Sequence, residues 1–443
     1  MSSVVIAPFH GLRYNSQKIK NMAEVVAPPY DVIDEALRDN LYAKNPFNVI
    51  RLILTKDEDG KSKNKYEIAQ SYLEDWKKQE ILRRDFTPQL YIYHQTYFLE
   101  GGRKLTRKGF IAARRLESFE TGRIRPHEHT FAGPKVDRMH LIKATQTNLS
   151  PIFGIYGDPN KKVLNLLENA PQKNLFIDIT TEDGNRHQLW GVSDLAILKQ
   201  VNEGMQDKVI FIADGHHRYE TALAYRDYLR GEGKLKDEND AANFVMMYLC
   251  PMEDEGLVIL PTHRVLLEKP KVSWPNALEK LKKHFEVNEY ATAHSAQALK
   301  DLENSKNEIA FLLSSDEGKL FLIKTNASKA AQIESLAKIP DAVRNLDVSI
   351  LHKYLLPQVF EVNLSEGDEA KKIHYVKDTS EALQAPFRKQ ACLSFILNPT
   401  QMVQVEEVSN IGERMPHKST FFYPKLLSGL LFNPVDGQEK VQL

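Results

Sequence analysis

Cysteine is almost absent from this chain of 443 residues, because only Cys250 and Cys392 occur. Both stand among apolar neighbours, so we expect small hydrophobic side chains and exclude a disulfide framework or a cysteine-based metal site. The sequence also lacks an apolar run of about 18 residues, the length that a membrane-spanning helix needs. Its first residues lack the basic and then apolar pattern of a signal peptide. We therefore expect a cytoplasmic protein with no membrane partner.

A surplus of either charge is missing too. Lys+Arg and Asp+Glu number 59 each, so the formal net charge at pH 7 is +0. A neutral chain offers no general field that attracts a nucleic acid backbone, and we expect no nucleic-acid partner. Any anion must then be bound by a local cluster of cations. The length exceeds one ordinary core, and charged amphipathic helices begin near residue 268, so we expect two domains, residues 1–265 and 266–443.

The most informative segment is an apolar, β-branched run at residues 209–213, which indicates a buried strand. Residues 219–230 predict a helix that ends at Gly231. Between them lie Asp214, Gly215, His216, His217 and Arg218. Backbone N–H groups at a helix start have no partner inside the helix and carry the positive end of its dipole, which makes an anion site. We interpret the segment as a phosphate-binding turn; the alternative is a capped turn with solvated histidines.

A second concentration of polar side chains lies at residues 124–138. Glu128 is a candidate acid or base there, and Lys135 and Arg138 are candidate phosphate contacts. His127 and His129 would share one face of a strand, but no third ligand at a suitable spacing supports a zinc site. A solvated charged loop is the alternative.

Two more clusters carry cations. His263 and Arg264 follow an apolar strand, where they either add a cation to a cleft or cap the strand. Lys418 and Thr420 belong to a Lys-Ser-Thr triplet like the end of a P-loop, but His417 replaces the glycine that this loop requires. We therefore exclude a Walker-type loop and keep Lys418 and Thr420 as candidate anion contacts.

Further patterns predict the surrounding elements. Alternating apolar residues and turn glycines predict strands at residues 48–54, 90–98, 104–113, 151–156, 244–249 and 257–260, and a helix at 66–80. Gly101 and Gly102 join the second and third of these strands as a hairpin. Residues 123–150 show no clean periodicity. Asp31, in a stiff turn after two prolines, is explained by turn chemistry and is a second candidate base.

The sequence Asp-Gly-His-His-Arg-Tyr at residues 214–219 resembles the signature of the ParB/sulfiredoxin-like superfamily, and within it the free-serine kinase branch. The resemblance implies a mixed α+β fold, with a ParB/sulfiredoxin-like core and insertions in residues 1–265. A smaller α/β C-terminal domain, residues 266–443, would close the site. His216 stands where sulfiredoxin has its cysteine, which excludes sulfinic-acid repair, and no helix-turn-helix of a DNA-partitioning ParB protein is found.

The wider pattern is similar to a large bacterial and archaeal family known mainly as a domain of unknown function. The motifs that carry this resemblance span most of the chain: residues 26–33, 127–130, 134–138, 148–153, 213–223, 261–264 and 415–425. This resemblance implies no activity, so the functional expectation depends on the shorter superfamily match.

Together these observations predict phosphoryl transfer to or from a small hydroxylated metabolite, with serine or phosphoserine as the first candidate, ADP or ATP as donor and Mg²⁺ assisting. We expect catalytic groups among Glu128, Asp214, His216, His217 and Arg218, with Asp214 also a candidate Mg²⁺ ligand. We expect phosphate or nucleotide contacts from Gly215, His217, Arg218, Tyr219, Lys135, Arg138, His263, Arg264, Lys418 and Thr420. The alternatives are a non-enzymatic module that binds a nucleotide or phosphometabolite, and phosphoester hydrolysis. A homo-oligomer is left open.

Overall fold

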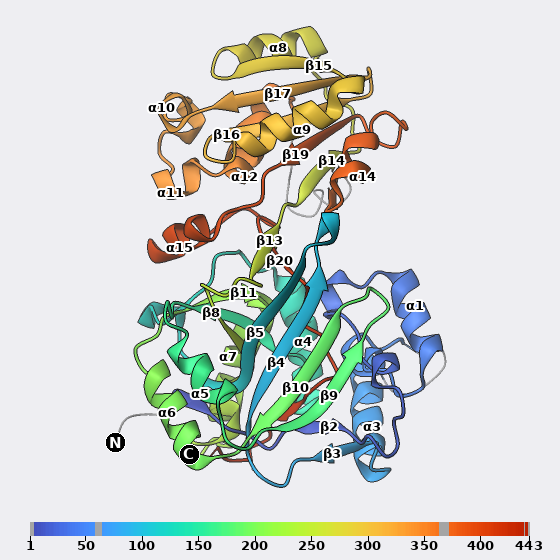
Figure 1. Cartoon of the computed structure of the whole chain (residues 1–443), viewed down its shortest axis with the longest axis vertical. Helices are drawn as coiled ribbons and strands as arrows, with labels where there is room; N and C mark the ends of the chain where they lie inside the picture. Colours follow the sequence, from blue (N-terminus) through green and yellow to red (C-terminus); the bar gives the residue numbers. More distant parts are fainter. Residues whose placement is uncertain (1–3, 58–63, 363–371, 438, 442–443) are drawn as a thin grey trace. The chain divides into compact units, whose positions relative to one another are not determined.

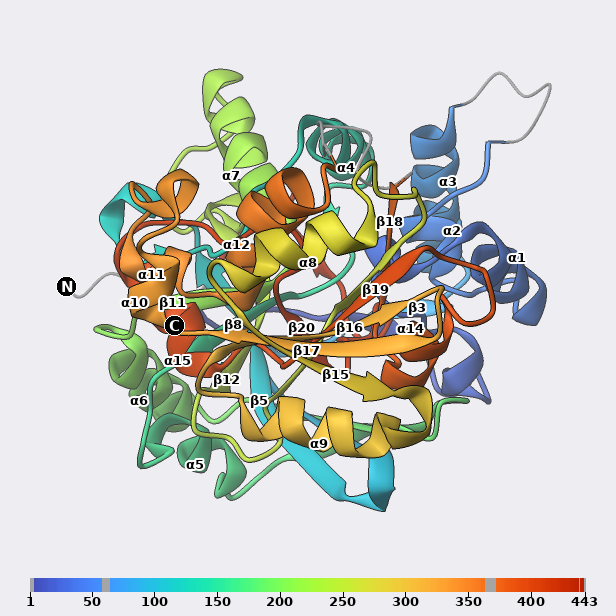
Figure 2. The same cartoon turned by 90° about the horizontal axis from the view of Figure 1, so that it is seen from above.

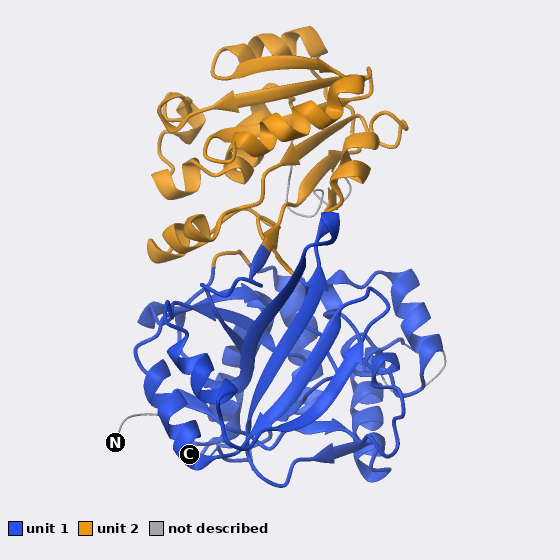
Figure 3. Ribbon diagram, in the orientation of Figure 1, with its two compact units in different colours: residues 1–126, 130–258, 424–443 blue, residues 127–129, 259–423 orange. Residues whose placement is uncertain are grey.

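The computed structural model describes residues 4–57, 64–362, 372–437 and 439–441. The chain forms two compact units (Figure 3). Unit 1 comprises residues 1–126, 130–258 and 424–443, and unit 2 comprises residues 127–129 and 259–423. The division into domains 1–265 and 266–443 stays a prediction, and the structure adds that the last twenty residues return to unit 1. In the described part of the chain, no helix is long and apolar enough to cross a membrane.

A mixed α+β fold is confirmed, and unit 1 is built on one large sheet (Figure 1). Among the described residues its strands run in the order β6 (Ile124–Arg125), β11 (Ile210–Asp214), β8 (Ile152–Tyr156), β12 (Phe244–Pro251), β5 (Lys104–Arg115), β4 (Leu90–Phe98), β10 (Arg186–Val192) and β9 (Asn174–Thr180), with β1 (Ile6–Ala7) also paired to β5. The predicted hairpin is present as β4 and β5, and both turn glycines have a φ of 80°. This left-handed conformation costs glycine least.

Helices and two small sheets surround this large sheet. The helices are α1 (Glu35–Lys44), α2 (Ile50–Ile53), α3 (Lys65–Lys78), α4 (Ala132–Thr145), α5 (Lys162–Glu168), α6 (Leu195–Met205) and α7 (His216–Gly231). Strand β2 (Leu12–Tyr14) pairs with β3 (Leu82–Arg84), and β7 (Thr147–Asn148) pairs with β21 (Asn433–Pro434). The last pairing brings the C-terminal residues of the chain into unit 1.

Two predicted elements differ from the structure, and one segment without a prediction forms a helix. The apolar segment 48–54, predicted as a strand, contains the single turn α2, and the side chain of Asn48 accepts a hydrogen bond from the backbone of Ile50 at the start of this turn. The segment 123–150 contains the helix α4, whose polar and apolar residues did not give a clean period. Helix α7 begins at His216, three residues before the predicted start. The histidines and Arg218 therefore lie in its first turn.

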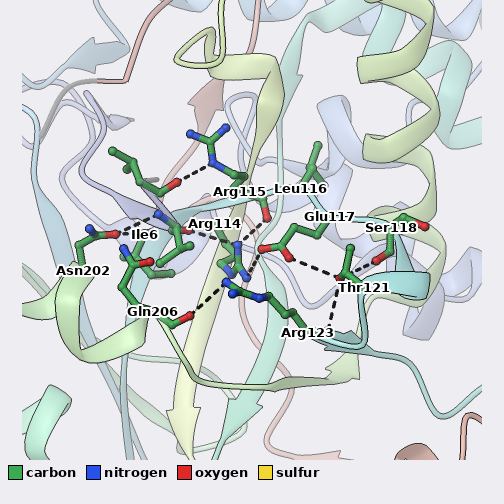
Figure 4. Close-up of polar contacts among 12 residues, drawn as sticks. Ile6, Arg114, Arg115, Leu116, Glu117, Ser118, Thr121, Arg123, Asn202 and Gln206 are labelled. Carbon is green, nitrogen blue, oxygen red and sulfur yellow. Dashed lines mark hydrogen bonds and ion pairs between the residues drawn. The ribbon is translucent and has the colours of Figure 1, made fainter. Parts of the chain in front are cut away.

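Buried polar contacts anchor the N-terminal strand to the sheet (Figure 4). The side-chain oxygen of Asn202 accepts hydrogen bonds from the backbone of Val5 and Ile6, at 3.0 and 3.1 Å. Arg114, which is 2% exposed, donates to Glu117 at 2.6 Å. A charged group this deep in a protein needs such a partner, so Glu117 stabilises the buried Arg114 of β5, while Asn202 of α6 holds the N-terminal strand.

Unit 2 is a six-stranded sheet within the described residues, in the order β15 (Glu286–Ala291), β17 (Lys319–Thr325), β16 (Ile309–Ser315), β19 (Leu393–Leu397), β14 (His263–Leu266) and β18 (Ile373–Val376). Its helices are α8 (Trp274–Lys282), α9 (Ser295–Asn304), α10 (Ala327–Ala330), α11 (Asp341–Arg344), α12 (Asp347–Ile350), the π-helix η8 (Leu351–Val359), α14 (Thr379–Gln384) and α15 (Met402–Asn410). Helices α8 and α9 cover opposite faces of the sheet (Figure 2), where they pack into two separate apolar clusters.

Candidate functional site

The turn between β11 and α7 has the conformation that an anion site requires. Gly215 stands at the N-cap with a φ of 92°, and no described side chain caps the first turn of the helix. A Cβ atom at this position would lie 3.0 Å from Cζ of Arg218. Glycine therefore both permits the left-handed backbone and leaves room for the guanidinium group that folds back over the turn.

An ion triad fixes Arg218 at this turn. Its Nη2 donates to Oδ2 of Asp214 at 2.6 Å, and its Nη1 donates to the carbonyl oxygen of Pro151. Nζ of Lys425 pairs with the other carboxylate oxygen of Asp214. Burial raises the pKa of Asp214, but the charges of Lys425 and Arg218 outweigh burial and hold that pKa below its usual value. Asp214 is thus an anion bridged by two cations.

Lys425 was not among the site residues predicted from the sequence. Its carbonyl oxygen accepts from Nε2 of Gln95 at 2.9 Å, and the carbonyl of Pro424 accepts from the buried Arg107 at 2.5 Å. Gln95 and Arg107 face each other across β4 and β5. The sequence did contain a signal for these contacts, because polar side chains in the middle of two buried strands require hydrogen-bond partners. The sequence could not reveal that the partners lie more than 300 positions away.

A cavity of unit 1 opens beside this triad. Its volume is about 60 Å³. On this scale one water takes about 10–15 Å³, so the space suits a group of a few heavy atoms rather than a whole nucleotide. Arg138 of α4 and Arg218 of α7 both line it, together with Tyr30, Ser150, Thr221 and the apolar side chains of Ile53, Leu141, Ile142, Ile152 and Val245. We call it the two-arginine cavity. The structure thus brings together two predicted cations that are 80 positions apart.

Two donor atoms at this cavity are unsatisfied. Nε of Arg218 and Oγ1 of Thr221 are buried and have no hydrogen-bond partner among the described residues. Thr221 is 5% exposed. Most buried polar groups in proteins are hydrogen-bonded, and leaving one unpaired costs about 1–3 kcal/mol. Arg218 and Thr221 thus each combine a place in the cavity lining with a buried donor atom that has no partner among the described residues.

Arg138 belongs to a second ion triad. Its Nη2 and Nε donate to Oδ2 of Asp137 at 2.5 and 2.9 Å, and Nζ of Lys65 lies 2.8 Å from Oδ1. Burial alone would raise the pKa of Asp137, but Arg138, Lys65 and the hydroxyl of Tyr66 lower it to about 2. The guanidinium of Arg138 also lies 4.1 Å from the ring centre of Tyr30, at the cavity.

Other predicted residues lie near the start of α7. Nε2 of His217 accepts a hydrogen bond from the backbone of Phe131 at 2.9 Å, and Lys135 forms an ion pair with Glu220 at 2.9 Å. Burial lowers the pKa of His217, while the negative charges of Glu220 and Asp31 oppose this effect. The carboxylate of Asp31 is exposed, and its charge acts on the imidazole of His217.

Two predicted contacts point into the protein instead. Tyr219 is fully buried, and its hydroxyl both donates to and accepts from the backbone of Glu117, at 2.8 and 3.1 Å. His216 is 5% exposed. Packing explains Tyr219 without a ligand, because its one polar atom is satisfied by the chain.

The remaining predicted residues gather within unit 2. The backbones of Glu128 and Met415 form an isolated β-bridge, and Nε2 of His127 lies 2.9 Å from Oγ1 of Thr420. Arg264, 1% exposed, donates to the carbonyl oxygen of Lys418 at 3.0 Å. The clusters around residues 128, 264 and 418 thus meet each other, although the sequence separates them widely.

His263 has a structural environment in unit 2. Its Nδ1 accepts from the backbone of Leu397 at 3.2 Å, and its Nε2 donates to Thr379 at 3.1 Å. Burial and the charge of Arg264 lower its pKa to about 4. A neutral, fully paired imidazole of this kind supports a strand rather than a phosphate.

A protein-held metal site does not emerge from the described part of the chain, where no group of three His, Cys, Asp or Glu side chains is arranged to hold an ion. Asp214, the candidate Mg²⁺ ligand, directs both oxygens at cations. Its donor set therefore does not fit a metal held by the protein alone.

The fold and the site define a mixed α+β protein with a cationic cavity in one unit. The chain belongs to the family described as "Protein of unknown function (DUF1015)", whose model matches residues 6–349. This confirms the resemblance to a domain-of-unknown-function family. Lys425, which pairs with Asp214, lies outside the matched range.

Several solved structures resemble the chain at low similarity. A conserved hypothetical protein from Pyrococcus furiosus is 16% identical, with 74% of this chain and 96% of that chain covered and a TM-score of 0.34. Free serine kinase in complex with AMP is 14% identical, with 75% and 93% covered and a TM-score of 0.35. SbnI with a C-terminal truncation from Staphylococcus aureus is 10% identical, with 72% and 85% covered and a TM-score of 0.35. No curated protein matches the chain. The function is therefore argued from the geometry of the site.

Proposed function

We propose that unit 1 binds a phosphate group in the two-arginine cavity and transfers a phosphoryl group between a nucleotide, ADP or ATP, and a small hydroxylated metabolite, with serine as the first candidate. One observation carries this proposal: Arg138, Arg218 and Thr221 line one cavity, and the last two each have a buried donor atom without a partner among the described residues. Guanidinium and hydroxyl donors match the oxygens of a phosphate group.

The size of the cavity supports a phosphate group as the bound part. At about 60 Å³ it has room for a phosphate but not for a nucleoside, which would lie outside it. The adjoining first turn of α7 adds backbone N–H groups and the positive end of the helix dipole. Both features stabilise negative charge, which is the main requirement of phosphoryl transfer.

The reaction needs a base that accepts the proton of the substrate hydroxyl as the oxygen–phosphorus bond forms and the bond to the nucleotide breaks. Asp31 is our candidate within unit 1, because its carboxylate is exposed and its charge acts on both His217 and Tyr30. Glu128, the base that the sequence suggested, stays a prediction. Mg²⁺ bound with the nucleotide phosphates supplies further charge neutralisation.

The proposal is tested by incubating the purified protein with ATP or ADP, Mg²⁺ and serine and measuring phosphoserine by mass spectrometry, then running the reverse direction from phosphoserine. Arg218→Gln should lower turnover by about 10²–10³-fold, the usual cost of one donor to a developing oxyanion. Arg230→Gln is the matched control, because Arg230 lies at the other end of α7 with a side chain 60% exposed. Normal turnover by Arg218→Gln would refute the proposed role of the cavity.

Two outcomes separate the alternatives. Nucleotide or phosphoserine binding without turnover would favour a non-enzymatic module that responds to a phosphometabolite, and release of inorganic phosphate alone would favour hydrolysis. Loss of turnover in Asp31→Asn but not in Glu128→Gln would identify Asp31 as the base, and the opposite result would identify Glu128.

A further inference from the structure

Each of the two arginines that line the two-arginine cavity is paired with a carboxylate that is bridged by two cations. Asp214 pairs with Arg218 at 2.6 Å and also with Lys425. Asp137 pairs with Arg138 at 2.5 Å and with Lys65 at 2.8 Å. In both triads one cation is an arginine that lines the cavity, and the other is a lysine on the far oxygen of the same carboxylate.

Each triad carries two positive charges and one negative charge, so its net charge is +1. Both carboxylates remain ionised at neutral pH, since the pKa of Asp137 is about 2 and that of Asp214 is below its usual value. Among the groups that interact with these residues, Arg107 adds a positive charge near Asp214, Asp31 adds a negative charge near Tyr30, and Lys135 pairs with Glu220. The two triads together carry a net charge of +2.

We infer that the two-arginine cavity is matched to a doubly charged anion, the terminal phosphate of a phosphate monoester, and that Lys425 and Lys65 are positioning residues that set this charge preference. The inference rests on the phosphate binding of the proposed function, but not on phosphoryl transfer. A singly charged group, such as a carboxylate or a phosphodiester, would leave one positive charge uncompensated in a partly buried site.

The lysines are needed because each arginine is already paired. An Asp–Arg pair by itself is neutral and attracts a further anion only weakly, since the carboxylate repels what the guanidinium attracts. A lysine on the other carboxylate oxygen cancels this repulsion and leaves the guanidinium both fixed in place and effectively cationic. The carboxylate thus orients the arginine, and the lysine restores its charge.

The test measures binding by isothermal titration at pH 8 and low ionic strength, with four probes: inorganic phosphate, sulfate, acetate and dimethyl phosphate. The wild-type protein should bind the two dianions at least about tenfold more tightly than the two monoanions, a difference of ~1.4 kcal/mol. Lys425→Met and Lys65→Met should each weaken phosphate binding by about tenfold and reduce the preference for dianions. Lys425→Arg and Lys65→Arg should retain it.

Lys78→Met is the control, because Lys78 is exposed on the same helix as Lys65, and it should bind all four probes like the wild type. Thermal unfolding of each variant shows whether it is folded, and the two lysines lie in separate triads, so the loss of one folded variant leaves the other as a test. Absence of binding by every probe would overturn phosphate binding itself. Equal binding of dianions and monoanions, or lysine variants that keep the wild-type preference, would overturn the charge matching while leaving phosphate binding intact.

Discussion

Replacing Thr221 by valine should stabilise the protein without ligand and weaken its binding of phosphate. The side chain of Thr221 is 5% exposed, and its hydroxyl has no hydrogen-bond partner among the described residues. Valine has nearly the same shape and removes only the unpaired polar atom. Because an unsatisfied buried group costs about 1–3 kcal/mol, the free energy of unfolding should rise by ~1 kcal/mol.

Thr145 provides a matched control on the neighbouring helix α4. Its side chain is 6% exposed, but its hydroxyl donates to the carbonyl oxygen of Leu141 at 2.8 Å. Thr145→Val loses this bond, so it should lower the free energy of unfolding by ~1 kcal/mol. The change in helix propensity from threonine to valine is the same in both variants and cancels. The effects of the two substitutions on the free energy of unfolding should therefore have opposite signs and differ by ~2 kcal/mol.

The assay is urea unfolding followed by circular dichroism, with and without inorganic phosphate. Phosphate at about 100 times its Kd should stabilise the wild type and Thr145→Val by ~2.7 kcal/mol. The same phosphate concentration should stabilise Thr221→Val by less, because its affinity is lower. If Thr221→Val destabilises the free protein as much as Thr145→Val does, the hydroxyl has a partner in solution and the reasoning is refuted. Equal stabilisation of both variants by phosphate would remove Thr221 from the site.

Two further predictions concern the charged groups. Asp214→Asn leaves two cations without their shared anion, so the free energy of unfolding should fall by ~3–5 kcal/mol. Adding Lys425→Met should recover part of this loss, which a double-mutant cycle measured by urea unfolding checks. If the effects of the two substitutions are fully additive, the triad is contradicted. The pKa of His263 is about 4 in the fold and about 6.5 in an unfolded chain, so the unfolded state takes up the proton first. The stability that His263 contributes is present above pH 6.5 and is lost as the pH falls toward 4, which urea unfolding at several pH values checks. NMR of the histidine rings should find His263 still neutral at pH 5.5, and a protonated ring at that pH would contradict the assignment.

The sequence predicted the strands and helices whose apolar pattern is long or bounded by turn residues. Strands β4 and β5 follow from alternating apolar residues and two glycines, and β11 follows from a short apolar run. The mixed α+β class could be inferred from such elements alone. The strand predicted for segment 48–54 was wrong: its apolar residues resemble a strand, whereas Asn48 accepts a hydrogen bond from the backbone of Ile50 and a helical turn follows.

The local part of the candidate site was also accessible from sequence, and the distant part was not. Glycine before two histidines and an arginine indicated the turn at the start of α7, because each feature depends on neighbours in the chain. Lys425 and Thr221 were missed for different physical reasons. Lys425 reaches Asp214 only because residues 424–443 return to unit 1, and Thr221 stands out only once the partners of its hydroxyl are known.

The contacts of Arg218 affect both the stability of the free protein and its capacity to bind an anion. A free arginine side chain gives up about 2 kcal/mol of rotamer entropy when a ligand immobilises it. In this protein Asp214 and the carbonyl of Pro151 already hold the guanidinium, so folding has met that cost before a ligand arrives. The same two contacts leave Nε unsatisfied, which lowers the stability of the free protein. Binding an anion should therefore release more free energy at this fixed, unsatisfied donor than at a mobile arginine on the surface. This difference explains why a cavity of only about 60 Å³ is a stronger candidate for phosphate recognition than the exposed cations of the chain.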